Sequence, residues 1–182
     1  GGSSVVFNLK NGKIRIVYEV FMKLNWLAMT FFTMSSSVIY AGELTIEFNG
    51  KGWDGVKVPS NEICRQYGGN GSTPSLKISK IPKGTNKLQT EYNAVDYAKL
   101  ANGGHGVLLY DHNGSQQASL KSVQGETNEM PKGVSLVSAN RWSGQGYLPP
   151  CSGGTGSRYS VTVKALKDND VLDQATIIIG RY

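Results

Sequence analysis

The chain has 182 residues, of which 39% are hydrophobic, and this is enough to bury the core of one domain. Its formal net charge at pH 7 is +6, but residues 1–41 hold four basic residues and one acidic residue, so they carry half of that charge. The other basic residues are scattered and form no basic helix, which disfavours nucleic acid as a partner.

Two segments precede the predicted domain. Residues 1–21 contain a strand-like run at 14–20 but are given no role; they are interpreted as translated upstream sequence, a wrongly assigned start, or residues added in cloning. Residues 22–41 join a short positive region, an apolar run and small residues, which is the arrangement of a secretory signal peptide cleaved after Ala41. A buried amphipathic helix or an uncleaved anchor is the alternative for the apolar run.

Residues 42–182 are predicted to form a single, mostly β domain. Short runs in which apolar and polar residues alternate predict its strands, at 44–48, 76–78, 88–92, 107–110 and 159–163. Only 94–101 has a weak helical pattern. The pattern as a whole indicates an all-β, sandwich-like fold with few short helices.

The segment 146–159 gives the strongest indication of a binding site. It combines a Pro-Pro-Cys corner with several glycines and leads directly into the strand predicted at 159–163. Prolines fix φ and remove backbone donors, whereas glycines allow the backbone to approach a neighbour closely. A loop of this composition at the start of a strand is typical of a pocket wall. An ordinary glycine-rich connection is the alternative.

The same segment resembles the second signature of the phosphatidylethanolamine-binding protein family, whose members are also called Raf kinase inhibitor-like proteins. The matching residues are its Pro-Cys and Arg-Tyr pairs: Pro150, Cys151, Arg158 and Tyr159. Ser157 stands where the family has a pocket histidine, and Ser-Gly replaces the double proline that follows the cysteine.

Four further stretches are similar to the family and follow in the same order. Residues 72–85 resemble its Ser-Pro-Pro-Leu and Val-Pro-Glu-Gly-Thr motifs, and 174–182 resembles its closing strand. Residues 104–110 resemble its His-Trp-Val-Leu-Tyr strand, with His105 on the pocket histidine. The first family signature falls on residues 94–98.

The first signature reads Asp-Pro-Asp-x-Pro in the family, and here only Asp96 is retained. Ala94 occupies the position of the pocket aspartate, and Asn93 precedes it. The loss of that aspartate and the change to Ser157 predict a pocket that binds its ligand more weakly, or binds a different ligand.

The resemblance implies a large antiparallel sheet packed on a smaller sheet, with a small pocket that takes phosphate or a lipid head group. Glycine-rich backbone N–H groups and imidazole donors suit phosphate oxygens. Carried over residue by residue, the ligand-binding set is His105, Asp96, Asn93, Pro150, Cys151, Ser157 and Tyr159. The stretch 167–174 is too short for the helix that the family has there, which predicts a more open pocket.

Several of these residues have a second interpretation. His105 is either a pocket residue or a strand histidine satisfied by a backbone carbonyl. Asp96 either faces the ligand or pairs with Arg158, and the sequence slightly favours the pairing. His112 lies in an Asp-His-Asn-Gly turn and is expected at the surface.

The two cysteines, Cys64 and Cys151, lie one in each block of family-like motifs. An even number of cysteines in a small exported domain favours a disulfide, which here closes a loop of about 87 residues. Two separate buried thiols are the alternative. With only two histidines, the chain lacks the spacing of a structural zinc site, and no metal or cofactor is expected.

These features together predict an exported, periplasmic or secreted binding protein for a small anionic or phospholipid head-group ligand. The alternative is a secreted interaction module that binds another protein and whose ancestral pocket has decayed. Catalysis is not expected, because the sequence shows no nucleophile elbow and no third acid to orient a Ser157–His105 pair. Inhibition of a kinase is not carried over from the family name.

Overall fold

The computed structural model describes residues 4–10, 13–19 and 43–182. The chain forms two compact units, Gly1–Ile39 and Tyr40–Tyr182. In the first unit, β1 (Ser4–Lys10) and β2 (Lys13–Glu19) pair as an antiparallel hairpin, so the strand-like run is confirmed as a strand over 14–19. The predicted signal peptide at 22–41 lies outside the described residues, and the predicted start of the domain at residue 42 is likewise untested.

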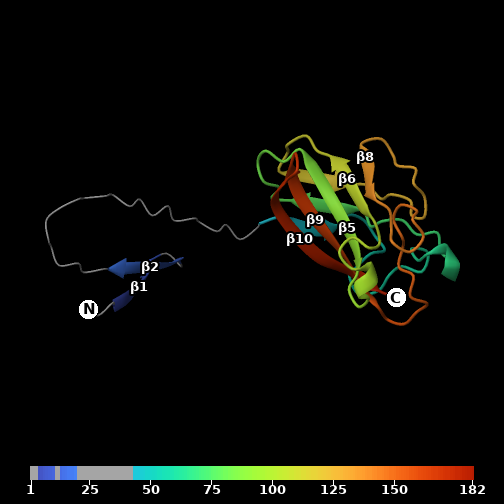
Figure 1. The fold of residues 1–182 in the computed structure, drawn as a ribbon, viewed down its shortest axis with the longest axis horizontal. Coiled ribbons are helices and arrows are strands. Elements are labelled where there is room, and N and C mark those ends of the chain that lie inside the picture. Colours follow the sequence, from blue (N-terminus) through green and yellow to red (C-terminus); the bar gives the residue numbers. More distant parts are fainter. Residues whose placement is uncertain (1–3, 11–12, 20–42) are drawn as a thin grey trace. The chain divides into compact units, whose positions relative to one another are not determined.

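The larger sheet of the second unit has five strands in the order β10-β9-β5-β6-β8, and all of its pairs are antiparallel (Figure 1). The central strand, β5, alternates strictly between half-buried and buried residues, because neighbouring side chains point to opposite faces of the sheet. The strands are β5 (Lys87–Ala94), β6 (Val107–Asp111), β8 (Val134–Ser138), β9 (Arg158–Lys167) and β10 (Asp170–Arg181).

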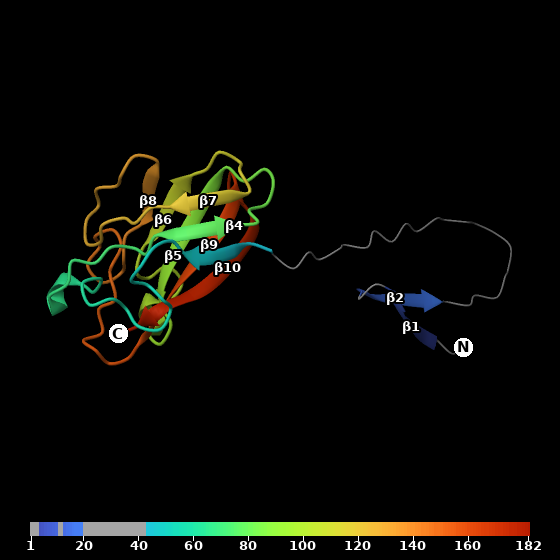
Figure 2. The same ribbon diagram turned by 180° about the vertical axis from the view of Figure 1, so that it is seen from behind.

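The smaller sheet has three strands in the order β3-β4-β7. They are β3 (Thr45–Phe48), β4 (Leu76–Ser79) and β7 (Gln117–Leu120). Seen from behind, β4 and β7 lie across the face of the large sheet (Figure 2). Leu76 and Ile78 of β4 are fully buried in one core with Leu88 and Val161 of the large sheet. The predicted architecture, a large antiparallel sheet packed on a smaller one, is therefore confirmed.

The weak helical pattern at 94–101 was the least accurate of these predictions. Ala94 is the last residue of β5 and pairs with Tyr159 of β9, so partners distant in sequence determine its backbone conformation. Only η2, a single 3₁₀ turn at Ala98–Leu100, is helical in this stretch. A second 3₁₀ turn, η1, spans Arg65–Tyr67. In the described part of the chain, neither turn approaches the length and apolar character that a membrane-spanning helix needs.

The connection between β9 and β10 is a tight turn. β9 ends at Lys167 and β10 begins at Asp170, so the short connection predicted from the sequence is confirmed and carries no helix. The other ends of these two strands lie beside the end of β5, as the pairing of Ala94 with Tyr159 shows. This end of the sheet carries the irregular loops that form the candidate site.

Candidate functional site

A cavity of about 340 Å³ lies where β5 ends and β9 begins. This volume falls within the range of small-molecule sites, roughly 300–1,000 Å³. Five of the seven predicted site residues line it: Asp96, His105, Cys151, Ser157 and Tyr159. Ala94 also lines it, at the position of the absent aspartate. Segments far apart in the sequence thus meet around one cavity.

The structure adds lining residues that the sequence analysis did not identify. They are Tyr97, Leu100, Trp142, Leu148 and Ser152. Tyr97 precedes the short turn η2 and Leu100 is its last residue, whereas Trp142 lies in a loop without strand pattern. Large aromatic residues in segments without a strand pattern were the feature of the sequence that could have identified Tyr97 and Trp142. Tyr97 is 44% exposed and Trp142 is 64% exposed.

His105 is buried in the wall of the cavity and is only 3% exposed. Its Nδ1 atom lies 2.8 Å from the carbonyl oxygen of Leu148. Because a carbonyl oxygen only accepts hydrogen bonds, Nδ1 carries the proton and Nε2 is the free acceptor of the neutral ring. Burial lowers the pKa of His105 to about 4, although the bond to Leu148 opposes the shift. The imidazole is therefore neutral at pH 7.

His105 is both bonded to a backbone carbonyl and part of the cavity lining, because its two ring nitrogens have different surroundings. One ring nitrogen is satisfied by a backbone carbonyl, while the side chain also lines the cavity. The ring of Tyr159 stands edge-on to it, with the ring centres 5.2 Å apart. No protein partner of Nε2 is found among the residues that the structure describes, so this lone pair remains available to a ligand.

Asp96 pairs with Arg158, as the sequence slightly favoured. The carboxylate accepts a 2.8 Å hydrogen bond from the Arg158 backbone N–H and a 3.0 Å bond from its Nε. The side-chain hydrogen bond to Arg158 is the main reason why the pKa of Asp96 falls to about 2. Asp96 thus holds the first residue of β9 in place from the edge of the cavity.

The loop 149–157, here called the cysteine loop, forms one wall. Its Cys151 is joined to Cys64 by a disulfide with a Cα–Cα distance of 5.3 Å, so the predicted bridge is confirmed. The Pro150 carbonyl accepts a hydrogen bond from the Cys64 N–H, and this places Pro150 behind the wall rather than in its lining. The Cys151 N–H donates to the Tyr159 hydroxyl at 3.1 Å.

Asn93 lies on the other face of β5 from Ala94, because neighbouring residues of a strand alternate. Its Oδ1 accepts a hydrogen bond from the Gly103 N–H at 2.6 Å, and its Nδ2 donates to the Glu91 carbonyl at 3.1 Å. The position of Asn93 therefore supports the 101–104 loop, outside the lining of the cavity.

The residues 140–146, here called the tryptophan turn, contribute Trp142 to a second wall of the cavity. Asn140 is 1% exposed, and its Oδ1 accepts hydrogen bonds from the N–H groups of Trp142 and Ser143 at 3.0 and 2.7 Å. The Arg141 guanidinium donates to the carbonyls of Ala101 and Asn102, both at 3.0 Å. Polar contacts therefore fix the turn to the loop around η2.

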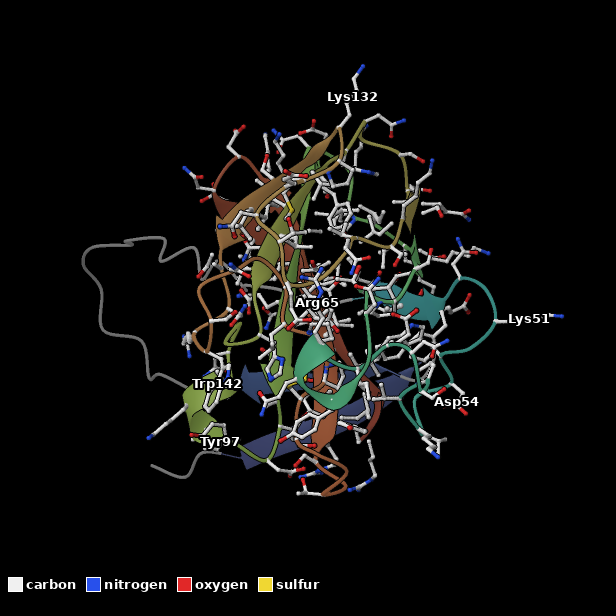
Figure 3. The ribbon with its side chains drawn as sticks, turned by 90° about the vertical axis from the view of Figure 1, so that its right-hand side faces the viewer. Lys51, Asp54, Arg65, Tyr97, Lys132 and Trp142 are labelled. Carbon is white, nitrogen blue, oxygen red and sulfur yellow. A yellow bond between two sulfur atoms is a disulfide. The ribbon has the colours of Figure 1, made fainter. Side chains whose placement is uncertain are left out.

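The end of the tryptophan turn requires a glycine. Gly146 has φ of 45°, and a Cβ atom there would lie 1.9 Å from the carbonyl oxygen of Thr127. With both ends of the turn fixed, Trp142 projects from the same side of the domain as Tyr97, beside η2 (Figure 3).

Ser157 and His105 both line the cavity but have separate hydrogen-bond partners. Ser157 Oγ is 2.9 Å from the Thr155 hydroxyl, and no hydrogen bond joins it to His105 in the described part of the chain. No cluster of three potential metal ligands occurs among the described residues. His112, as expected, lies in a surface turn, where its Nε2 is 2.7 Å from the Ser115 carbonyl oxygen.

No protein-family model matches the sequence, and no curated protein matches it at a significant level. Among solved structures, the fold is similar to that of a phosphatidylethanolamine-binding protein homolog from Chlamydia trachomatis. The TM-score is 0.51 at 17% identity, over 78% of this chain and 98% of the other.

A second similar structure is that of YbcL from Escherichia coli, described as a member of the mammalian phosphatidylethanolamine-binding protein family. The TM-score is 0.53 at 18% identity, over 77% of this chain and 98% of the other. At this level of identity, the similarity concerns the fold. The chain therefore has the fold of the phosphatidylethanolamine-binding proteins, as the motif resemblance predicted.

Proposed function

We propose that this chain is a non-catalytic binding protein whose ligand is a small molecule with a phosphate-type head group, held in the cavity beside His105. The observation that carries the proposal is the cavity itself. Its volume of about 340 Å³ suits a small molecule, and five residues predicted from family motifs line it together.

The lining suits a free anion poorly at neutral pH. The hydroxyls of Ser152 and Ser157 can donate hydrogen bonds, but His105 offers an acceptor until Nε2 is protonated, and its pKa is about 4. Asp96 adds a negative charge, although Arg158 balances it. Inorganic phosphate is therefore expected to bind weakly at pH 7, and a true ligand gains affinity from further contacts.

The proposal includes export to the periplasm or the exterior. The disulfide between Cys64 and Cys151 supports it, because such bonds persist in oxidising compartments and are rare in the cytosol of mesophiles. The signal peptide predicted at 22–41 supports it independently. The competing function, a secreted interaction module with a decayed pocket, is supported by Ala94 and Ser157, which lack the charged groups of the family.

Isothermal titration calorimetry of the full chain with inorganic phosphate and O-phosphoethanolamine tests the proposal. We expect saturable binding of O-phosphoethanolamine in the wild type and loss of that binding in Ala94→Leu, which fills the cavity without removing a polar group. Ser157→Leu is a second filling variant at a less buried position. Unchanged binding in both folded variants would place the ligand elsewhere. A folded wild type that binds neither compound would favour the decayed pocket.

A further inference from the structure

We propose that the mouth of the cavity, formed by Tyr97 and Trp142, holds a quaternary ammonium group of the ligand by contact with their aromatic faces. The inference rests on the proposed function and narrows its ligand class. A phosphate-type head group would carry the cation a few bonds away, as in phosphocholine. Phosphate alone would fill only part of the site.

The two rings are exposed, yet their segments are fixed. Trp142 follows Arg141, whose guanidinium is bound to two carbonyls, and its own N–H is bound to the buried side chain of Asn140. The carbonyl of Tyr97 accepts a hydrogen bond from the Leu100 N–H at 2.9 Å, which closes the turn η2. The protein therefore presents two aromatic side chains to solvent on preorganised backbone, which lowers the entropy cost of binding.

The charges of the lining favour a cation over an anion. Asp96 is the lining residue that carries a full charge at pH 7, and His105 presents the lone pair of a neutral ring. The faces of Trp and Tyr rings are the negative ends of their quadrupoles and attract cations within about 6 Å. The guanidinium groups of Arg141 and Arg158 are already bound to carbonyls and to Asp96.

The charged acceptor of the lining, Asp96, is already engaged, and this favours a cation that donates no hydrogen bonds. A primary ammonium needs hydrogen-bond acceptors for its three N–H groups. The carboxylate oxygens of Asp96 are occupied by Arg158, and the free acceptor of His105 lies in the buried wall. A quaternary ammonium donates no hydrogen bonds and needs only the aromatic faces.

Calorimetric titration of the full chain at pH 7 with four probes tests the inference. The probes are phosphocholine, its isostere 3,3-dimethylbutyl phosphate, in which carbon replaces the cationic nitrogen, inorganic phosphate and glucose. We expect phosphocholine to bind about tenfold more tightly than the isostere or phosphate. Vesicles of phosphatidylcholine, used in a sedimentation assay, distinguish a membrane lipid from a soluble source of the same head group.

Variants of the mouth separate ring chemistry from apolar contact. Trp142→Leu and Tyr97→Leu should each weaken phosphocholine binding about fivefold, whereas Trp142→Phe should lose less because it keeps an aromatic face. Val137→Ala changes an exposed residue of β8 that does not line the cavity, and should have no effect. These side chains are exposed, so the variants are expected to fold.

The outcomes distinguish failure of this inference from failure of the proposed function. If phosphate or the isostere binds as tightly as phosphocholine, and Ala94→Leu abolishes both, the cavity is a binding site but the ammonium contact is wrong. Tighter binding of glucose than of phosphocholine would also overturn the ammonium contact, in favour of a sugar stacked on the rings. Absence of binding by every probe would remove the proposed function itself.

Discussion

The two walls of the cavity are irregular loops that are held in place by different means. The cysteine loop (149–157) is fixed by a covalent bond to Cys64. The tryptophan turn (140–146) has no such bond and depends on the buried amide of Asn140 and the guanidinium of Arg141. Backbone outside a sheet must find other partners for its polar groups, and here each wall does so in its own way.

The difference has a thermodynamic consequence. In the chain-entropy account, a disulfide stabilises mainly by restricting the unfolded chain. The hydrogen bonds of the tryptophan turn act in the folded state, where their loss leaves buried groups without partners. Removing the disulfide and removing the hydrogen bonds of Asn140 should therefore both lower the free energy of unfolding, but only the first should change the m-value.

The largest effect is expected from removing the disulfide. The double variant Cys64→Ser, Cys151→Ser opens a loop of 87 residues. The loss in the free energy of unfolding should be about 4 kcal/mol. Urea unfolding measures it, and the m-value should rise because the unfolded chain becomes less compact. A loss below about 1 kcal/mol would contradict the chain-entropy account of this bridge.

The second effect concerns His105, whose bonded partner Leu148 lies just before the cysteine loop. The pKa of His105 is lowered from 6.5 to about 4 in the folded protein, so between these values the unfolded chain binds the proton and the folded chain does not. Stability should therefore fall as the pH drops from 6.5 to 4 and level off below it. The expected fall is on the order of 3 kcal/mol.

The control for this titration is His105→Asn, which keeps an N–H donor near the position of Nδ1 but does not titrate. Urea unfolding at several pH values should show a much flatter profile for the variant between pH 6.5 and 4. An equally steep profile in the variant would assign the pH dependence to other groups.

The third effect tests the tryptophan turn. Asn140→Ala removes the acceptor of two backbone N–H groups and should cost about 2 kcal/mol in the free energy of unfolding. Unlike the loss of the disulfide, this change should leave the m-value unaltered, because the unfolded state is the same. Ser143→Ala is the matched control, since it removes the two side-chain hydrogen bonds between Ser143 and Asn140 and keeps the backbone bonds. A larger loss in the control would contradict the role given to Asn140.

The sequence predicted the regular part of the fold well, because alternation reports on local geometry. Strands β3, β4, β5, β6 and β9 were all anticipated from it. Within residues 43–182, β10 was anticipated only from its resemblance to the closing family strand. In the same range β7 and β8 were missed; they are short and largely exposed and so show little contrast between their faces. The helical pattern at 94–101 failed because Ala94 pairs with a residue of β9 that lies 65 positions later.

The residues of the candidate site also fall into two groups, those that the sequence predicted and those that it did not. Residues within the family-like motifs, such as His105 and Tyr159, were brought to the cavity as predicted. Trp142 was not anticipated, because its position depends on contacts between Arg141 and carbonyls about 40 residues earlier in the chain. Asn93 is the immediate neighbour of Ala94 in the sequence, yet the alternation of side chains along a strand places it on the other face of β5. Sequence motifs therefore located the cavity, whereas tertiary contacts determine what forms its mouth.

The smallest effect is expected at Asp96, whose ion pair with Arg158 fixes the junction between the cysteine loop and β9. The folded pKa of Asp96 is lowered to about 2, so its stabilising contribution is present above the unfolded pKa of about 3.8 and is lost as the pH falls through 2. Because both side chains are more than a third exposed, solvent and salt screen the pair. Asp96→Asn should lower the melting temperature slightly at pH 7, and the difference from the wild type should disappear at pH 2 or in 1 M salt.

Asp111→Asn provides the matched control, because Asp111 forms an exposed pair with Lys87 at the other end of β5, away from the cavity. The two variants should change thermal stability by similar small amounts, since both pairs are exposed to solvent. A clearly larger effect of Asp96→Asn would mean that the disulfide does not suffice to hold the cysteine loop. The cysteine loop and the tryptophan turn would then both depend on polar contacts at their ends, and the disulfide would be only one of several supports of the cysteine loop.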